Sequence, residues 1–169
     1  RDALKQLASA LVLSRIDYCN STFIGLPACT IAPLQHLQNA AARLVMGLRA
    51  RDHVTSTLAE LHWLPVRFRI SFKVSLIMFL IGLHSHQCPA YLSNIVTPLN
   101  SEPSRRRLRS STGTDYLIPR TKTKFGERSF SVAGPTTWNA LPESVRAAAD
   151  VATFKRLLKT HYFESAFML

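Results

Sequence analysis

Much of what enzymes and secreted proteins rely on is scarce in this sequence of 169 residues. Three cysteines are too few for a disulfide framework, and we expect no signal peptide and an intracellular, reducing environment. The six glycines occur singly, so there is no glycine-rich loop to hold a phosphate. The longest apolar run, residues 74–83, is about half of a membrane span, so we interpret it as a buried helix and expect no membrane partner.

Catalytic patterns are scarce as well. The G-x-S-x-G pattern of hydrolases does not occur. The five aspartates stand apart from one another and no Tyr-x-Asp-Asp occurs, whereas two-metal polymerase chemistry needs carboxylates clustered on adjacent strands. We therefore expect no enzymatic activity, no cofactor and no small-molecule substrate.

One group of potential metal ligands leaves an alternative open. His84, His86 and Cys88 alternate, so on an extended segment they could face one side and bind zinc, as in a small metal-dependent nuclease. Zinc needs a fourth ligand or a bound water, and no C-x-x-C pair accompanies these residues. A polar helix end is the simpler interpretation, and we expect no metal.

Apolar and positively charged residues are plentiful. The apolar fraction of 47% is that of a globular protein, and the length fits one domain, or one helical domain with a tail. Lysine and arginine outnumber the acidic residues 21 to 10, and 15 of the 21 are arginine. Because arginine binds phosphate in a bidentate manner and stacks on bases, this bias favours a polyanionic partner over a basic surface without one.

Apolar residues recur at helical spacing through residues 1–96 and predict a mainly α fold with about four helices there. We expect helices over 2–23, from a cap at Thr30 to a stop at Gly47, over 54–62 and, after Pro65, over 66–84, with one or two turns at 91–96. The residues predicted to face inward from the first two helices are Leu4, Leu7, Ala8, Leu11, Val12 and Ile16, and then Leu34, Leu37, Ala41, Leu44 and Val45.

The rest of the chain divides into two parts. Residues 97–128 carry three prolines, eight basic residues and three acidic ones, and predict an irregular basic arm with a short strand at 116–118. Residues 129–169 predict an apolar cluster and then an amphipathic helix capped by Asp150. We thus expect three parts, 1–96, 97–128 and 129–169.

Two tryptophans lie in apolar surroundings. A Trp near basic residues can stack on a base, but Leu61, Leu64 and Val66 flank Trp63, and packing in the core is the commoner role. Trp138 has similar surroundings. The residues to which we assign structural roles are Trp63, Pro65, Phe130 and Trp138.

Five short segments stand out from the helical background. They are Asp17-Tyr18-Cys19-Asn20-Ser21, Gln38-Asn39-Ala40-Ala41-Ala42-Arg43-Leu44, Leu61-His62-Trp63-Leu64-Pro65-Val66, Arg128-Ser129-Phe130-Ser131 and Gly134-Pro135-Thr136-Thr137-Trp138-Asn139-Ala140-Leu141-Pro142. In this order they resemble the C-terminal part of the reverse-transcriptase protein of LINE-type (non-LTR) retrotransposons, in the jockey-like group. The resemblance covers nearly the whole chain, from about residue 14 to residue 167.

In that family one polyprotein carries an endonuclease, a reverse transcriptase with fingers, palm and thumb, and a C-terminal region. The resemblance implies that residues 1–96 form a thumb-like helical bundle and that the rest is the C-terminal extension. The endonuclease and the palm carboxylates have no counterpart here, so it implies a noncatalytic fragment of an RNA-directed DNA polymerase, cut from a longer protein and located in the nucleus. The expected partners are RNA or an RNA–DNA duplex and the missing palm domain.

By this resemblance, the thumb helices contact the backbone of the template–primer duplex rather than its bases. We choose candidate residues by local charge density. Arg67, Arg69 and Lys73 lie in the first two turns of a predicted helix, where the dipole disfavours them, which indicates an external anion. The run at 105–109 has two alternatives, a solvated loop or a nuclear-localisation patch. The full set is Arg43, Arg49, Arg51, Arg67, Arg69, Lys73, Arg105, Arg106, Arg107, Arg109, Lys122 and Lys124.

Asn39 and Asn139 lie within the resembling segments and are expected to satisfy backbone groups or caps.

The alternative function is a structural or interaction fragment that depends on its missing palm and has no activity of its own. Its sign would be exposed apolar surface, with a first helix that lacks a partner.

Overall fold

The computed structural model describes residues 1–83, 90–99 and 114–167. It is mainly α-helical, with 69% helix and no strand among the described residues, which confirms the predicted fold class. Contacts divide the chain into two compact units, Arg1–Lys73 with Lys159–Leu169, and Val74–Leu158. This division falls between Lys73 and Val74 and places the final turns of the last helix with the first unit, whereas the parts at 1–96, 97–128 and 129–169 stay a prediction from the sequence.

The first unit begins with an interrupted helix instead of the single one predicted over 2–23. Helix α1 (Asp2–Ala8) continues through a π-helical turn at Ser9–Leu13 into α2 (Ser14–Asp17), and a 3₁₀ turn follows at Asn20–Phe23. Between α2 and the 3₁₀ turn, Cys19 has a φ of 50°, in the left-handed region, which ends the helix. The helical segment therefore stops six residues before its predicted end.

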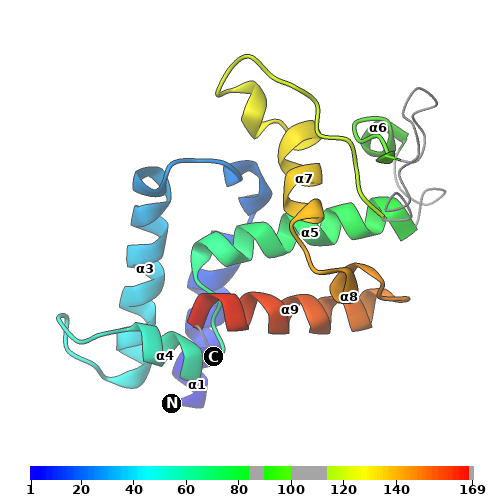
Figure 1. Cartoon of the computed structure of the whole chain (residues 1–169). Coiled ribbons are helices and arrows are strands. Elements are labelled where there is room, and N and C mark those ends of the chain that lie inside the picture. The colour runs from blue at the N-terminus through cyan, green and yellow to red at the C-terminus, as the bar shows by residue number, and fades with distance from the viewer. Residues whose placement is uncertain (84–89, 100–113, 168–169) are drawn as a thin grey trace. The chain divides into compact units, whose positions relative to one another are not determined.

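Three further helices follow in order, α3 (Ala28–Met46), α4 (Thr55–Glu60) and α5 (Val66–Leu83). The predicted cap at Thr30 is wrong, because the helix begins two residues earlier and the Thr30 N–H donates to the Pro27 carbonyl at 3.0 Å. The predicted stop is confirmed, since Gly47 has a φ of 68° that costs a glycine little. In Figure 1, α3 runs antiparallel to α1.

The core of the first unit lies where these helices meet. Ala8, Ile16 and Ala42 are buried together with Leu58 and Trp63, and Trp63 is only 4% exposed. Ala8 on α1 and Ala41 and Ala42 on α3 are small, which lets two helices approach closely. The indole of Trp63 is therefore part of the core, not a surface available to stack on a base.

Two predicted inward-facing rows are partly wrong. Leu4, Leu7 and Leu11 are 43%, 56% and 63% exposed, and Leu37 and Leu44 on α3 are 48% and 68% exposed. The π-helical turn inserts an extra residue, so the apolar residues before it no longer share a face with those after it. On α3, the polar Gln38 and small alanines occupy the inward face instead.

The second unit is built around the second half of α5. Figure 1 shows α7 crossing α5 within this unit. Neither α7 nor α8 was predicted as a helix. The remaining elements are α6 (Ala90–Ser93), a 3₁₀ turn at Gly126–Arg128, α7 (Phe130–Asn139), α8 (Glu143–Arg146) and α9 (Val151–Phe167), whose end belongs to the first unit.

Aromatic rings fill the core of this unit. The rings of Phe79 and Phe154 are stacked with centroids 4.0 Å apart, and Trp138 lies 5.9 Å from Phe154. Tyr116 meets Trp138 edge-on at 6.2 Å, and its burial raises the pKa of its phenol. Such contacts add to the apolar area that these large side chains bury.

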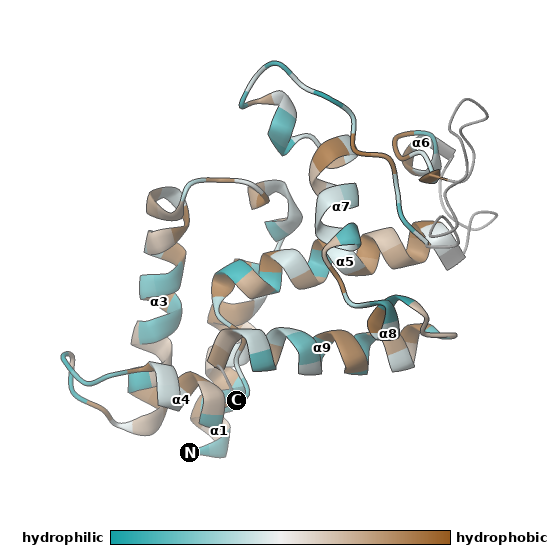
Figure 2. Cartoon of the chain, in the orientation of Figure 1, coloured by the Kyte–Doolittle hydropathy of each residue, from teal (hydrophilic) through white to brown (hydrophobic). Residues whose placement is uncertain are grey.

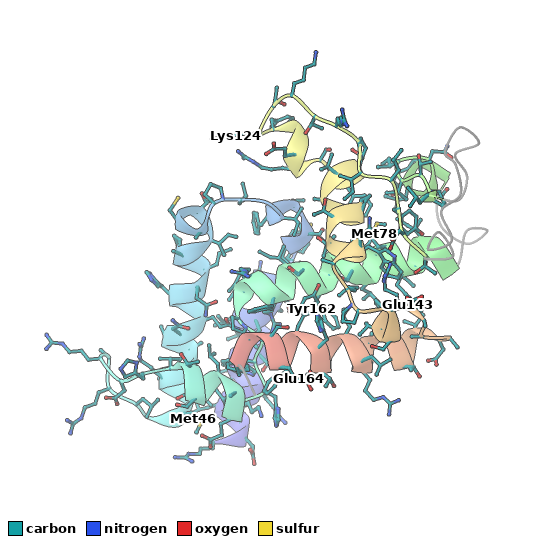
Figure 3. The ribbon with its side chains drawn as sticks, in the orientation of Figure 1. Met46, Met78, Lys124, Glu143, Tyr162 and Glu164 are labelled. Atoms are coloured by element: carbon teal, nitrogen blue, oxygen red, sulfur yellow. The ribbon has the colours of Figure 1, made fainter. Side chains whose placement is uncertain are left out.

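Close packing of α7 on α5 depends on a glycine. A Cβ added at Gly134 would lie 2.8 Å from Met78 Sδ and 3.3 Å from the Phe130 ring. Figure 3 places Met78 where the two helices cross. The Gly-Pro-Thr-Thr-Trp-Asn segment therefore has a packing role, since it brings α7 against α5.

The predicted strand at 116–118 is wrong, because a single antiparallel bridge joins Pro98 and Tyr116. The N–H of Leu117 donates to the Thr97 carbonyl at 2.8 Å, and the N–H of Leu99 to the Asp115 carbonyl at 2.9 Å. Too few residues pair to form a strand. Two described parts of the predicted arm, 97–99 and 115–117, are therefore joined to each other by backbone hydrogen bonds.

Helix α9 begins as predicted. One carboxylate oxygen of Asp150 accepts the N–H groups of Ala152 at 2.8 Å and Thr153 at 2.9 Å, which confirms the N-cap. Phe154 and Leu158 are fully buried. The ribbon of α9 alternates between hydrophilic and hydrophobic colours in Figure 2, as an amphipathic helix does.

Candidate nucleic-acid interface

One side of α3 carries polar residues spaced four apart, and these fix the start of α5. Gln35 Nε2 donates to Asn39 Oδ1 at 2.8 Å and to Gln38 Oε1 at 3.0 Å. Gln35 Oε1 accepts the N–H of Val66, the first residue of α5, at 2.9 Å. The fully buried Gln38 donates to the Leu64 carbonyl at 2.9 Å. The Gln38 bond thus joins two of the five conspicuous sequence segments, 38–44 and 61–66.

The loop after α3 is closed by local hydrogen bonds. Arg43 donates from Nε and Nη2 to the Asp52 carbonyl, at 3.3 and 3.1 Å. The Asp52 N–H donates to the Arg49 carbonyl at 3.1 Å, and Asp52 Oδ2 accepts the Arg49 N–H at 2.7 Å. The loop therefore holds Arg51 and His53 in place next to Arg43.

An open pocket of about 530 Å³ lies between this loop, α3 and the end of α9, all within the first unit. Arg43, Arg51 and His53 line it together with the amides of Gln35 and Asn39, and Asp52 adds one acidic group. Its apolar wall consists of Val54, Leu58, Pro65, Ala166 and Phe167. The pocket thus combines hydrogen-bond donors and positive charge with an apolar wall.

A second hollow, of about 330 Å³, adjoins the first along α3 because the two share Gln35 and Asn39. Arg67, at the start of α5, lines it with His36 and three apolar residues. Arg43 and Arg51 of one predicted basic group and Arg67 of another therefore line adjoining hollows on one side of α3. We name this side the α3 basic face, which consists of Gln35, Asn39, Arg43, Arg51, His53 and Arg67.

Arg69 does not belong to this face. Its guanidinium forms a bidentate ion pair with the Asp17 carboxylate, with Nε 2.7 Å from Oδ1, and its side chain is only 19% exposed. The position of Arg69 in the first turn of α5 therefore has an internal explanation, which corrects the inference of an external anion at this residue. Lys73, one turn later, is exposed.

The other candidates lie apart from the α3 basic face. Arg49 is exposed in the loop but does not line the pocket. Lys122 and Lys124 are exposed in the second unit, where Lys124 lies on the loop before the 3₁₀ turn (Figure 3). Arg105, Arg106, Arg107 and Arg109 lie outside the described residues.

Of the four residues to which we assign structural roles, two are buried tryptophans and two are partly exposed. Trp138 is 4% exposed, and its Nε1–H donates to the Thr114 carbonyl at 2.8 Å. Phe130 is half-buried, and Pro65 lines the 530 Å³ pocket. Together with the buried Trp63, these residues shape the cores and one pocket wall.

The two asparagines differ in what they bind. Asn139 pairs its whole amide with the backbone of Tyr116, accepting its N–H at 3.0 Å and donating to its carbonyl at 2.8 Å, as expected. Asn39 instead accepts from the side chain of Gln35. The expectation that Asn39 satisfies a backbone group is therefore wrong.

Sequence reasoning missed several residues of this pocket. Gln35, His53 and Phe167 were not candidates, although they line it with Arg43 and Arg51. The spacing of Gln35, Asn39 and Arg43, four residues apart, could have placed them on one helix face. No local signal indicates Phe167, because it lies more than a hundred residues further along the chain.

The described residues lack both a metal-binding cluster and a membrane-spanning helix. No cluster of three or more His, Cys, Asp or Glu is arranged there to hold a metal ion. His84, His86 and Cys88, the residues of the zinc alternative, fall outside the described ranges. None of the described helices combines the length and apolar content needed to cross a membrane.

Comparisons with known proteins add no family. No family model, curated protein or solved structure matches this chain.

Proposed function

We propose that this chain binds the backbone of RNA or of an RNA–DNA duplex, without catalysis, as the thumb-side and C-terminal part of a LINE-type reverse transcriptase. The observation that supports the proposal most is the α3 basic face, where Arg43, Arg51 and Arg67 come from separate segments of the sequence to one side of a helix. Arginine suits this role because its planar fork matches phosphate oxygens.

The geometry of these side chains supports backbone contact. Arg51 and Arg67 are exposed, and Arg43 uses two of its N–H groups on the Asp52 carbonyl, which leaves others for a ligand. Arg67 lies over the ring of Phe68, with its guanidinium carbon 5.3 Å from the ring centroid, which limits its freedom. An arginine that is already oriented loses less conformational entropy when it binds a phosphate.

The test is binding of the purified chain to a fluorescent RNA–DNA hybrid across a salt series. We expect the logarithm of the affinity to fall linearly with the logarithm of the salt concentration, because each phosphate contact releases bound counterions. The variant Arg43→Ala/Arg51→Ala/Arg67→Ala, which removes the three arginines of the α3 basic face, should bind more weakly and reduce the salt slope by about one for each phosphate contact that is lost.

A matched control separates a specific face from diffuse charge. The variant Arg15→Ala/Lys155→Ala/Lys159→Ala removes the same charge from three other exposed residues. It should change affinity and slope much less than the first triple variant. Equal losses in the two variants, or an affinity that does not depend on salt, would contradict the proposal.

A second candidate function is an interaction fragment that docks on a further protein surface. The exposed row of Leu4, Leu7 and Leu11 favours it, because soluble proteins rarely leave a helical row of leucines uncovered. This function predicts that the purified chain self-associates and that an added palm domain suppresses the self-association. A chain that stays monomeric up to high concentration would contradict it.

A further inference from the structure

We infer that the 530 Å³ pocket beside α3 binds a single nucleotide unit, with its phosphate at Arg43 and Arg51 and its base against the apolar wall. This inference deepens the proposed function by naming what one pocket would recognise. The volume lies within the range of small-ligand pockets, which bind through an apolar lining and a few placed polar groups.

The donors that would bind the phosphate are groups that the described residues leave available. No hydrogen bond joins Arg51, His53, Asn39 Nδ2 or Arg43 Nη1 to another group in the described part of the chain. Among the described residues of the lining, Asp52 is the only acidic one, and its carboxylate already accepts the Arg49 N–H. The lining therefore has an excess of positive charge and of donors, which suits an anion.

The apolar wall of the pocket offers a surface for a planar ring. Phe167 and Pro65 contribute to it with Val54 and Leu58. The ring of Phe167 packs on Phe163 at 4.7 Å between centroids, and this contact fixes its orientation. Bases stack on aromatic rings with little dependence on sequence, so the pocket would accept any base.

A base in a duplex cannot enter such a pocket without leaving its stack. The chemistry therefore points to an unpaired nucleotide, either at a strand end or free in solution. The α3 basic face continues along the helix to Arg67, so a strand whose terminal nucleotide occupies the pocket can place its next phosphates near Arg67.

The experiment measures binding of adenosine monophosphate, ribose 5-phosphate and inorganic phosphate to the whole chain by NMR titration at low salt. We expect adenosine monophosphate to bind tightest, because only it provides both a phosphate and a base. Equal affinity for the three would show that no base is recognised and would overturn the inference. So would absence of binding by the mononucleotide.

Two variants with a matched control locate the site. Arg51→Ala should weaken mononucleotide binding about tenfold, the cost of one charge-assisted hydrogen bond. Arg49→Ala removes the same charge two residues away, outside the lining, and should have an effect of less than about twofold. Phe167→Leu keeps an apolar side chain but removes the ring. It should weaken the binding of adenosine monophosphate by about fivefold or more while leaving the affinity for ribose 5-phosphate unchanged. Equal effects of Arg49→Ala and Arg51→Ala would overturn the site.

A final comparison separates this inference from the proposed function. A blunt RNA–DNA hybrid and the same hybrid with one unpaired nucleotide are titrated with the unmodified chain. If the hybrid with the unpaired nucleotide binds more tightly than the blunt hybrid, and the Phe167→Leu variant loses this difference, the result supports nucleotide binding in the pocket. Salt-dependent binding that is equal for the two would overturn the pocket and leave backbone binding intact, whereas no binding of either would contradict the proposed function itself.

Discussion

The two ends of the chain carry amphipathic helices with opposite outcomes. On α9, Phe154 and Leu158 are fully buried, whereas on α1 the leucines Leu4 and Leu7 are about half exposed. Both helices show apolar residues at helical spacing, so their patterns alone do not distinguish them. The difference arises because aromatic partners from distant segments cover α9, while the π-helical turn and the small inward residues of α3 leave the leucines of α1 uncovered. A periodic pattern therefore indicates a helix, but not which of its apolar residues will be covered.

The largest expected effect comes from Trp138→Ala in the aromatic core of the second unit. The variant leaves a cavity beside Phe79 and Phe154 and removes a donor to the Thr114 carbonyl, so we expect a loss of about 3–5 kcal/mol in the free energy of unfolding. Hydrogen exchange of the α7 amides measures this loss within the unit. A loss below about 1 kcal/mol would show that the core is loosely packed.

Gly134→Ala is expected to have the next largest effect. Helix propensity alone predicts a gain of up to about 1 kcal/mol from this change. The new Cβ would lie 2.8 Å from Met78 Sδ, and Met78 is fully buried, so we expect a net loss of about 1–3 kcal/mol instead. Denaturant unfolding decides the sign, and a stabilised variant would contradict the close crossing of α7 and α5.

A smaller and pH-dependent effect is expected at Asp150, the N-cap of α9. Its hydrogen bonds to the Thr153 side chain and backbone lower its pKa below the ordinary value of 3.8. The cap therefore stabilises the fold fully above pH 3.8 and loses this contribution as the pH falls towards the lower pKa of the folded chain. Melting curves of the chain and of Asp150→Ala should differ most near neutral pH and converge in acid. A difference that grows in acid would contradict the cap.

The smallest effect on stability is expected from Leu7→Gln/Leu11→Gln on the exposed row. Because both side chains are more than half exposed, the free energy of unfolding should change by about 0.5 kcal/mol or less. Sedimentation should nevertheless show less self-association, because the apolar surface is reduced. A large loss of stability would mean that the row is covered within the chain, and the contrast with α9 would disappear.

Local features of the fold could be predicted where a single residue decides them. Gly47 ends α3 and Asp150 begins α9 because left-handed backbone and side-chain capping depend on one residue type at one position. The helices at 130–139 and 143–146 were not predicted, because one contains Gly134 and Pro135 and the other has only one turn. Their helical state depends on packing rather than on propensity.

The candidate site was predictable only in part. Arg43, Arg51 and Arg67 were chosen from local charge density, and the structure gathers them beside Gln35 and Asn39. Arg69 was chosen for the same reason, but it pairs with Asp17, 52 residues earlier in the chain. Charge density identifies basic residues, whereas a partner distant in sequence leaves no local signal.

By itself, the sequence determined the helical class, the helix boundaries at Gly47, Val66 and Asp150, and the excess of arginine, because each follows from residue type and spacing. Tertiary structure alone decided which leucines are buried and which of the candidate arginines is neutralised by a carboxylate. It also decided that Phe167 and Arg51 share one pocket. These outcomes depend on contacts between segments far apart in the chain, and periodicity and composition contain no information about such contacts.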